Sequence, residues 1–339
     1  MEQERTAADR ESTAADREGS IADQGITVAA LGPQALPAVV DLCRRALDLP
    51  EDAAEAAALV ETLHSRAAAD RTVLGLGAYR GAELVGVLIA SLAAHEPGSG
   101  HVDLVAVAPQ ARRRGVGRAL LGRAERALAE RGATEVLLAG NPPYYAWPGI
   151  DVRYTPAVCA ALALGYAQDR TAWNMTADLS YDESPALRGT EAAERRLADG
   201  GVTVRRAEPA DLPALTAFAR VTFGGSWDAE LAGSVGRPAA GAHLAERDGR
   251  IVGFAAWGSS RPSWFGPMGT APEAAGGGIG GVLLRRCLRD QRDAGMRSAQ
   301  IGWVGPVPFY SGSAGARIER VFFLYRKVLP TARTGRESE

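Results

Sequence analysis

The sequence has almost no lysine, few cysteines and no excess of charge of either sign. Only Lys327 is a lysine among 38 basic residues, and 40 acidic residues leave a net charge of −2. This balance provides no overall basic field to attract nucleic acid or an anionic membrane. The three cysteines, Cys43, Cys159 and Cys287, are odd in number, far apart and in no metal-binding spacing. We therefore expect a reducing compartment, no nucleic-acid partner and no metal.

Long apolar runs are also absent. The stretch from Val87 to Ala94 is typical of the longest, well short of the roughly 18 residues that cross a bilayer. The first residues, MEQERTAADR, have neither a basic segment nor an apolar core typical of an export signal. The sequence therefore predicts a cytoplasmic protein with no membrane partner.

Length and composition indicate two globular domains. The chain has 339 residues, of which 46% are hydrophobic and 23% charged, values ordinary for a globular protein. Residues 1–24 repeat the polar motif TAADRE and are predicted to form a disordered or weakly helical tail. Residues 331–339 form a second predicted tail.

The hydrophobic periodicity predicts a mixed α/β fold that occurs twice along the chain. The first copy, 25–180, has expected strands at 26–31, 73–79, 84–94, 102–107, 136–139 and 172–179, and expected helices at 36–49, 52–67, 115–131 and 156–164. The second copy, 201–330, follows a predicted linker at 181–200. Its expected strands are 202–206, a hairpin over 243–257, one ending near 270, 299–303 and 321–329, with helices at 213–223, 280–295 and near 310.

Corresponding landmarks in the two halves indicate an internal duplication. The motif Val85-Gly86-Val87 corresponds to Val252-Gly253-Phe254, and Pro109 corresponds to Pro272. The repeat is too long for a solenoid. Two copies of one mixed α/β domain are the simplest explanation.

The sharpest local feature is a glycine-containing loop between a strand and a helix. After Pro109 the sequence reads Arg112-x-x-Gly115-x-Gly117. Glycines let consecutive backbone N–H groups converge at a helix N-terminus, where the helix dipole also favours an anion. The neighbouring guanidinium groups add charge-assisted donors, and a diphosphate is the expected ligand. These basic residues are Arg112, Arg113, Arg114 and Arg118.

The second half repeats this loop without its arginines. Aligned on the prolines, Gly278 and Gly280 correspond to Gly115 and Gly117, and Ala275 replaces Arg112. A P-loop is excluded because no Gly-Lys-Ser/Thr occurs, and the third glycine of a dinucleotide fingerprint is missing. A plain arginine-capped turn would explain one such loop, but two in matching contexts favour a binding function.

These motifs resemble those of the GNAT acyltransferases in their tandem form. The resemblance rests on VDLVAVAPQARRRGVGRALL in the first half and GPMGTAPEAAGGGIGGVLLRRCL in the second, and it extends over residues 26–329. It implies two GNAT folds, each with a mixed sheet splayed between its fourth and fifth strands. It also implies acetyl-CoA, or another acyl-CoA, as bound ligand and cosubstrate.

The resemblance also implies roles for individual residues. Backbone groups of the strand before each loop would contact pantetheine, namely those of Val105, Val107, Met268 and Thr270. The loop amides would bind the pyrophosphate, in the first half at Arg112, Arg113, Arg114, Gly115, Val116, Gly117 and Arg118. The corresponding positions in the second half are Gly276, Gly277, Gly278, Ile279 and Gly280.

Each half lacks a different part of the expected machinery. Members of this family commonly use a tyrosine on the short helix after the fifth strand as the acid that protonates the leaving thiolate. In the first half this position is Ala161, whereas Tyr310 occupies it in the second, one residue further from Gly315 than the family spacing. We therefore expect the first half to bind acyl-CoA tightly in a structural role, and the second to bind it more weakly and catalyse transfer.

The remaining polar residues identify no general base. Asp228 and Glu230 follow Trp227 in a region that often lines the acceptor site of GNATs, but surface charge is the simpler interpretation. His64, His95, His101 and His243 show no ligand spacing, and buried packing is the expected role of Cys159. Trp227, Trp257, Trp264, Trp303 and Phe309 are expected mainly in the core, although an aromatic cleft beside Tyr310 would also suit a small amine.

The sequence thus predicts a tandem acyltransferase that moves an acetyl group from acetyl-CoA to a small-molecule amine. An alternative from another class is a non-catalytic acyl-CoA-binding or sensing protein derived from a duplicated enzyme. A protein lysine acetyltransferase has weaker support, because no acidic groove for a basic peptide is evident.

Overall fold

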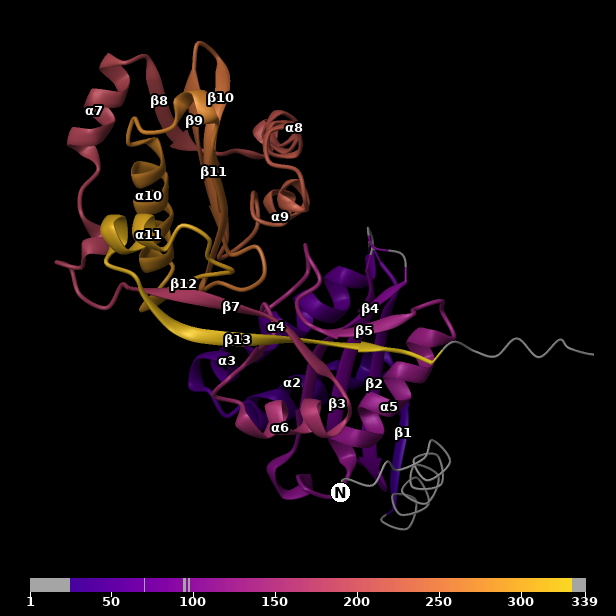
Figure 1. The fold of residues 1–339 in the computed structure, drawn as a ribbon. Coiled ribbons are helices and arrows are strands. Elements are labelled where there is room, and N and C mark those ends of the chain that lie inside the picture. Colours follow the sequence, from indigo (N-terminus) through magenta and orange to yellow (C-terminus); the bar gives the residue numbers. More distant parts are fainter. Residues whose placement is uncertain (1–24, 70, 94–95, 97, 331–339) are drawn as a thin grey trace, which may run out of the picture. The chain divides into compact units, whose positions relative to one another are not determined.

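The computed structural model describes residues 25–69, 71–93, 96 and 98–330 and divides the chain into two compact units (Figure 1). The first consists of the chain up to Asn141, Tyr154–Asp169 and the chain from Tyr325, and the second of Pro142–Arg153 and Arg170–Leu324. The units therefore do not coincide with the two copies along the chain. The predicted tails, 1–24 and 331–339, lie outside the described residues.

In the first unit, a five-stranded sheet is completed by the end of the last strand of the chain. The order is β1 (Ile26–Ala30), β2 (Val73–Arg80), β3 (Glu83–Leu92), β4 (Ser99–Val107), β5 (Glu135–Leu138) and then the end of β13 (Arg317–Val328). All pairs are antiparallel except β4 with β5, which is parallel. The second copy thus supplies the end of β13 to the first unit. In turn, most of β7 (Ala167–Asp178), the last strand of the first copy, belongs to the second unit.

The helices of the first unit follow the predicted pattern with one exception. α2 (Leu36–Ala46), α5 (Val116–Ala129) and α6 (Thr155–Ala163) occur where they were expected. The single helix predicted over 52–67 is wrong: the chain forms α3 (Pro50–Ala54), α4 (Ala56–Val60) and a π-helical turn, η2 (Glu61–Arg66). The break between α3 and α4 is at Glu55, whose φ of −99° and ψ of 14° leave the helical region.

The second unit repeats the mixed sheet and places helices on both of its faces. The strand order is β8 (Val202–Arg206), β9 (Gly241–Arg247), β10 (Arg250–Trp257), β11 (Trp264–Thr270), β12 (Ser298–Ile301) and β7, with only β11 and β12 parallel. In Figure 1, α8 (Leu212–Thr222) and α9 (Trp227–Ala232) lie on one side of this sheet, and α10 (Ile279–Asp293) and α11 (Val307–Ala314) on the other. A short strand, β6 (Ile150–Asp151), pairs with β13.

Alternation along β10 explains how both faces are covered. Phe254 and Ala256 pack in a core with residues of α8 and α9, whereas Ala255 and Trp257 pack in a core with residues of α10. Successive side chains of a strand point to opposite faces, so a continuous apolar strand supplies both cores. The mixed α/β fold with two copies is thus confirmed.

The segment 181–200, predicted to be a linker, is part of the packed second unit. It contains a 3₁₀ turn, η5 (Pro185–Leu187), and helix α7 (Glu191–Asp199). Leu197 of α7 lies in the core, and Glu194 accepts hydrogen bonds from Arg286 of α10 at 2.6 and 2.9 Å. The charged composition that indicated a linker is the outer face of this helix.

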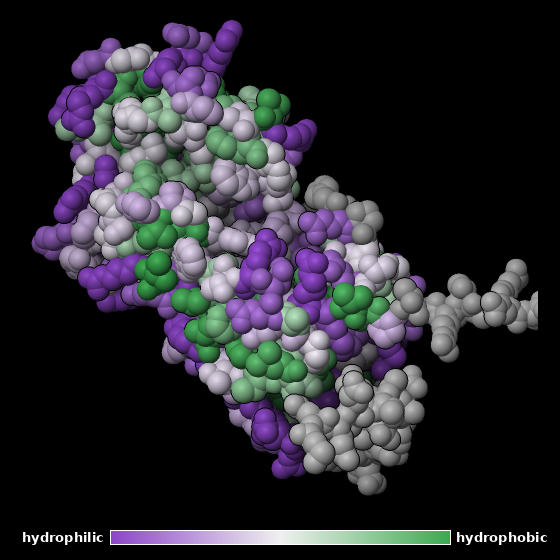
Figure 2. Space-filling model, in the orientation of Figure 1, coloured by the Kyte–Doolittle hydropathy of each residue, from purple (hydrophilic) through white to green (hydrophobic). Residues whose placement is uncertain are grey.

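The surface is polar and mixed. The view in Figure 2 shows hydrophilic side chains over most of the molecule, interrupted by small apolar areas. Within the part of the chain that the structure describes, no helix has the length and apolar character to cross a bilayer.

Candidate functional site

The two glycine-containing loops have the same backbone conformation, position by position. Each begins with a 3₁₀ turn, η4 (Pro109–Ala111) or η7 (Pro272–Ala274), that directly follows a strand. The next residue is extended in both cases: Arg112 has φ −66° and ψ 157°, and Ala275 has φ −68° and ψ 155°. The loop shape is therefore independent of the side chain at this position.

Both loops then use left-handed backbone to enter the helix. Gly115 and Gly278, the residues before α5 and α10, have φ of 78° and 90°. Two residues earlier, Arg113 has φ 61° and Gly276 has φ 82°. A positive φ is rare for a residue with a side chain, so the first loop tolerates strain at Arg113 that the second avoids with glycine.

The helix that follows each loop presents unused amide donors. The first helical backbone bonds run from Ala119 to Gly115 and from Val282 to Gly278. The N–H groups before these donors have no partner inside the helix, and the helix dipole makes them an anion site. The backbone of both loops thus fits a diphosphate.

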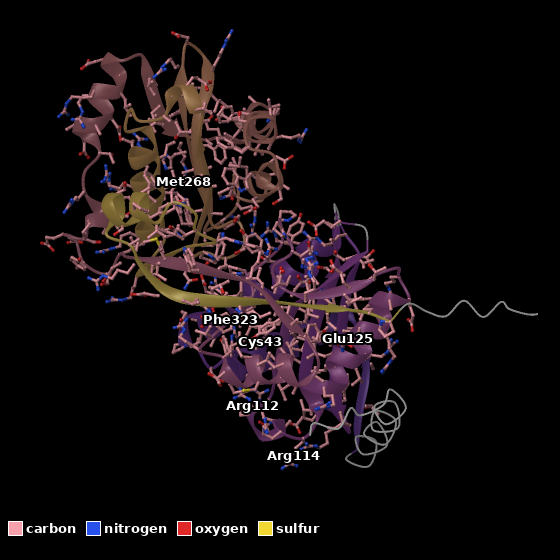
Figure 3. All side chains as sticks on the ribbon, in the orientation of Figure 1. Cys43, Arg112, Arg114, Glu125, Met268 and Phe323 are labelled. Atoms are coloured by element: carbon pink, nitrogen blue, oxygen red, sulfur yellow. The ribbon has the colours of Figure 1, made fainter. Side chains whose placement is uncertain are left out.

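The side chains around the first loop have different roles. Arg112 is held by the protein: its guanidinium donates to Ala46 O at 2.8 Å and Val107 O at 3.2 Å and pairs with Asp48 at 3.0 Å. It therefore ties the end of β4 to the end of α2. Arg113, Arg114 and Arg118 are exposed. Figure 3 shows Arg112 and Arg114 together at one end of this unit, with Arg114 outermost.

The second loop has an apolar cover instead of arginines. A Cβ atom added to Gly280 would lie 3.3 Å from the ring of Phe309 and 3.6 Å from the methyl group of Met268. At the corresponding Gly117 the nearest atom, a methyl carbon of Val107, is 3.9 Å away. The first loop is therefore open and cationic, and the second is neutral and partly covered.

Each loop lies beside an opening in its sheet. β4 pairs with β5 only from Ser99 to His101, and β11 pairs with β12 only at Trp264 and Phe265. Beyond these points, within the described residues, the two parallel strands of each pair no longer form a ladder. The positions predicted to contact pantetheine, Val105, Val107, Met268 and Thr270, all lie beyond these points.

Tyr310 lies in α11 against the core of the second unit. Its side chain is 8% exposed, and its ring centroid is 5.0 Å from that of Phe309 and 6.2 Å from that of Phe265. Burial raises the pKa of Tyr310 above its ordinary value, so the phenol stays protonated. In the first unit, Ala161 of α6 is buried at the tyrosine position.

Comparison with known proteins agrees with these features. The model of the Acetyltransferase (GNAT) family matches residues 39–146, which include β4, the first loop and α5. Residues 39–146 therefore resemble a GNAT acetyltransferase domain. A curated relative, the mycothiol acetyltransferase of Thermomonospora curvata, is 34% identical over 217 residues. This match covers 60% of the present chain and 65% of that relative, just under two thirds of its length.

Solved structures extend the GNAT fold to both units. A GCN5-related glucosamine N-acetyltransferase region of a fungal multi-domain β-N-acetylglucosaminidase has a TM-score of 0.69 at 18% identity, covering 89% of this chain and 38% of that one. The tandem GNAT protein from the clavulanic acid biosynthesis pathway has a TM-score of 0.66 at 16% identity, covering 89% and 98%. A GCN5-related N-acetyltransferase from Sphaerobacter thermophilus has a TM-score of 0.61 at 19% identity, covering 90% and 96%.

The structure corrects the interpretation of Glu230 as a surface charge. In the second GNAT unit, Glu230 of α9 is only 5% exposed and accepts one side-chain hydrogen bond, from Ser226 Oγ at 3.1 Å. Burial raises the pKa of its carboxyl to about 8. The side chain of Asp228 is half-buried and pairs with Arg220 at 2.8 Å. The sequence signal that separates them is weak: Glu230 precedes the buried Leu231 in a six-residue helix.

Another carboxyl that was not singled out from the sequence, that of the half-buried Asp103, lies at the opening of the first unit. Asp103 of β4 accepts a hydrogen bond from Ser91 Oγ at 2.7 Å, and within the described residues its other oxygen is buried without a partner. Burial raises the pKa of Asp103 to about 7. Asp103 lies two residues beyond the last paired residue, His101.

Other candidate residues have structural roles or lie apart from the loops. Cys159, expected to be buried, is exposed on α6, whereas Cys43 and Cys287 are buried. His95 lies outside the described residues. Tyr154 donates to Asp52 at 3.0 Å and so fixes the start of α6. Among described residues, no group of three or more potential ligands could hold a metal.

The aromatic residues of the second copy divide into two sets. Trp227 packs with Phe223 and Phe254, and Trp257 lies in the core, as expected. Trp264 is also buried, as expected, whereas Trp303 is exposed. Both rings contact that of Tyr145, at centroid distances of 5.4 and 5.6 Å.

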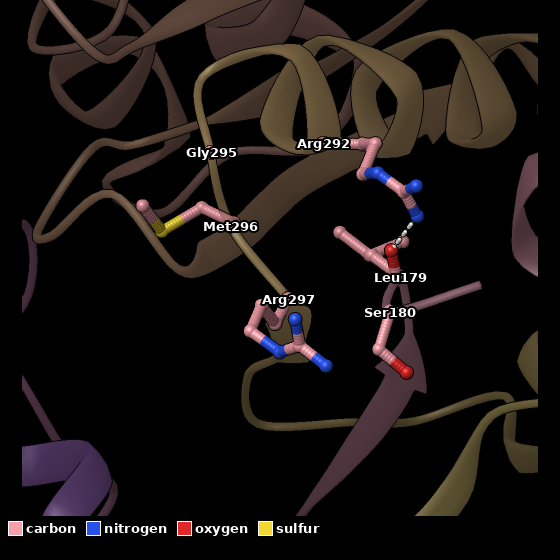
Figure 4. A pocket seen from close by; sticks show the side chains of 6 residues that line it. All are labelled: Leu179, Ser180, Arg292, Gly295, Met296 and Arg297. Atoms are coloured by element: carbon pink, nitrogen blue, oxygen red, sulfur yellow. Dashed lines mark hydrogen bonds between the residues drawn. The ribbon is translucent and has the colours of Figure 1, made fainter. Parts of the chain in front are cut away.

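A pocket in the second unit lies directly after the last residue of β7, Asp178. It is lined by Leu179, Ser180, Arg292, Gly295, Met296 and Arg297 (Figure 4). Arg292 donates to the carbonyl oxygen of Leu179 and pairs with Asp182 at 2.8 Å. Its guanidinium is therefore engaged by the protein, and the pocket is separate from the loop before α10.

Proposed function

We propose that this chain is an acyl-CoA-dependent N-acyltransferase that moves an acetyl group from acetyl-CoA to the amine of a small molecule. The observation that carries the proposal is the position-by-position match of two amide-lined loops, each beside an opening in a GNAT sheet. The name of the curated relative, a mycothiol acetyltransferase, supports a small-molecule acceptor of that type.

The first unit is proposed to hold acyl-CoA tightly. Its loop amides, from Arg113 to Arg118, would bind the diphosphate, and the free guanidinium groups of Arg113, Arg114 and Arg118 would add charge. Arg112 would contribute through its main chain, since its side chain is occupied by Asp48 and Ala46. Backbone groups at Val105 and Val107 would bind pantetheine.

The second unit is proposed to bind more weakly and to catalyse. It keeps the amide donors at Gly276, Gly277, Gly278, Ile279 and Gly280 but has no arginine in this loop. Each charge-assisted hydrogen bond contributes about 1.5–3 kcal/mol, so the loss of one weakens affinity by roughly 10- to 100-fold, and the loss of a second weakens it further. Because Phe309 and Met268 partly cover this loop, they would also weaken its affinity for CoA.

Tyr310 is the proposed acid of the transfer. Its buried phenol is protonated, which is the form that donates a proton to the leaving thiolate. A backbone N–H between Met268 and Thr270, on the unpaired side of β11, would stabilise the oxyanion. The bound acetyl-CoA would supply the thioester, and no metal is involved in the proposed step.

The burial of Tyr310 and the cover over Gly280 favour one alternative, a non-catalytic acyl-CoA-binding protein. Release of free thiol from acetyl-CoA in the presence of small amines separates the two, because a binding protein does not turn over.

Calorimetric titration of the full chain with CoA, for the unmodified protein and for Arg113→Ala/Arg114→Ala/Arg118→Ala, tests the assignment of the two loops. The full chain is required because each unit contains strands from both copies. We expect one tight and one weak site, with only the tight site weakened in the variant. Two sites of equal affinity would overturn the division of roles.

A further inference from the structure

Three arginines of the second unit lie close together without a matching carboxylate. They are Arg188, which directly follows η5, and Arg285 and Arg289 of α10. Arg289 donates a hydrogen bond to the carbonyl oxygen of Arg188 at 3.4 Å. Burial lowers the pKa of the Arg285 guanidinium, and the charges of Arg188 and Arg289 lower it further. Like charges repel at short range, so the cluster costs free energy that a bound anion would offset.

The protein itself does not use up the charge and the donors of this cluster. The carboxylate that attracts Arg289 is that of Glu194, which already accepts hydrogen bonds from Arg286 at 2.6 and 2.9 Å. Arg285 donates through Nη1 to the carbonyl oxygen of Ser313 at 3.0 Å, but its buried Nε has no hydrogen-bond partner among the described residues. Within the part of the chain that the structure describes, none of the three arginines forms an ion pair. An anion bound here would therefore satisfy a buried donor as well as balance charge.

Arg285 lies beside the second glycine-containing loop. A Cβ atom added to Gly281, in the first turn of α10, would lie 3.5 Å from the Nη2 atom of Arg285. Helical side chains lean toward the N-terminus of their helix, so this guanidinium extends back toward the loop amides, where the helix dipole also favours an anion. η5, α10 and α11 all contact one another, and Figure 1 shows α10 and α11 on the same side of the sheet. The arginines thus form one cationic region next to the loop.

The two copies place an arginine at different positions of the helix that follows the loop. When Gly115 is aligned with Gly278, Arg118 corresponds to Gly281 and Gly122 corresponds to Arg285. Arginine and glycine are therefore exchanged between two positions that lie one helical turn apart. Because Gly281 has no side chain, the guanidinium of Arg285 has room near the loop. The second unit thus provides a cation here although its loop has none.

A ligand with two separate anionic groups fits this arrangement. In the proposed function, the amides of residues 276–280 bind the diphosphate of CoA. The arginines lie further along α10, which rises about 12 Å from Gly281 to Arg289. CoA carries a second anionic group, the phosphate on the 3′ oxygen of its ribose, and 3′-dephospho-CoA lacks it.

We infer that Arg188, Arg285 and Arg289 bind the 3′-phosphate of the CoA molecule whose diphosphate lies at the second loop, and that this site selects CoA over 3′-dephospho-CoA. The inference rests on the proposed function. Guanidinium groups match a phosphate group in charge and geometry and can donate two hydrogen bonds each. The cluster would thus restore to the second site part of the affinity that its loop lacks.

Native mass spectrometry of the full chain, titrated with CoA and separately with 3′-dephospho-CoA, tests the inference because it counts the first and the second bound ligand. We expect the second ligand to bind about 10- to 100-fold more tightly as CoA than as 3′-dephospho-CoA, the effect of one charge-assisted hydrogen bond. Arg285→Gln should abolish this preference and leave the first binding step unchanged. Arg285→Lys keeps the charge and should retain part of the preference.

Two further variants separate phosphate binding from effects on folding. Arg188 is exposed, so Arg188→Ala leaves the packing intact and should still reduce the preference of the second step for CoA. Arg292→Gln is the matched control, because this arginine lies at the other end of α10 and its charge is balanced by Asp182. The preference in Arg292→Gln should equal that of the unmodified protein.

The outcomes distinguish the inference from the function on which it rests. If the second step binds CoA and 3′-dephospho-CoA equally well in the unmodified protein, the inference is overturned, while the binding of CoA at two loops stands. The same holds if the preference persists in both Arg285→Gln and Arg188→Ala. If no second molecule of either ligand binds, the proposed function of the second loop fails and the inference fails with it.

Discussion

The two glycine-containing loops have the same backbone conformation but are surrounded by different side chains. Arg112 and Ala275 have nearly the same φ and ψ, and Gly115 and Gly278 both enter their helix from left-handed backbone. The first loop is flanked by arginines and open, whereas Phe309 and Met268 cover the second. The same loop geometry thus occurs in two different side-chain surroundings, and both loops share the proline and the glycine that precedes the helix.

The largest expected effect concerns the proposed acid. Tyr310→Phe removes the proton donor but keeps the ring that packs on Phe265 and Phe309, so we expect the transfer rate to fall by about 10²–10⁴-fold. Steady-state thiol release measures it. Tyr154→Phe, which alters a tyrosine of the first unit, is the control and should keep its rate; full activity of Tyr310→Phe would contradict the assignment.

Removing charge from the first loop should have the next largest effect. In Arg113→Ala/Arg114→Ala/Arg118→Ala the amides remain but the free guanidinium groups are lost. CoA affinity of the tight site should fall by about 10- to 1000-fold, as measured by calorimetry. Arg220→Ala, a surface arginine paired with Asp228, is a matched charge control. Unchanged affinity in the triple variant would show that this loop does not bind the diphosphate.

Adding charge to the second loop is the converse experiment. Gly277 and Gly281 correspond to Arg114 and Arg118, and a Cβ atom at Gly277 would meet nothing nearer than 3.9 Å. We expect Gly277→Arg/Gly281→Arg to tighten the weak site by about tenfold. Gly276→Arg is the strained control, because its φ is 82°. If the substitutions leave the CoA affinity of the weak site unchanged, contact with Phe309 and Met268, rather than missing charge, limits binding there.

The smallest effect concerns the stability of the first unit. The pKa of Asp103 is about 7 when folded and about 3.9 in an unfolded chain, so the folded state binds more protons between these values and stability falls as pH rises through them. We expect Asp103→Asn to remove this loss. Between pH 4 and pH 8, the free energy of unfolding of the variant should fall by about 1–3 kcal/mol less than that of the unmodified protein. Urea unfolding at both pH values measures it, and parallel pH profiles would be the contrary result.

Much of the fold could be predicted because its signals are local. The hairpins, the loops after Pro109 and Pro272 and the helices that follow depend on nearby glycines, prolines and apolar periodicity. The exchange of β7 and β13 between units could not be predicted, since nothing within either strand specifies which sheet it joins. The helix predicted over 52–67 failed for a related reason, as its break at Glu55 has no glycine or proline to signal it.

The candidate site was predictable only in part. The amide-lined loops follow from spacing. Glu230 and Asp228, however, lie two residues apart with similar chemistry, and packing buries the first while it leaves the second half-buried in an ion pair with Arg220. Likewise Tyr145 lies in a proline-rich segment whose position is fixed by tertiary contacts with Trp264 and Trp303.

The central claim is that both loops bind the diphosphate of coenzyme A, with unequal strength. Native mass spectrometry of the full chain across a CoA titration tests it most directly. The account predicts a first CoA bound at low concentration and a second only at roughly 10- to 1000-fold higher concentration. A protein that stays free of CoA over the whole titration would contradict it.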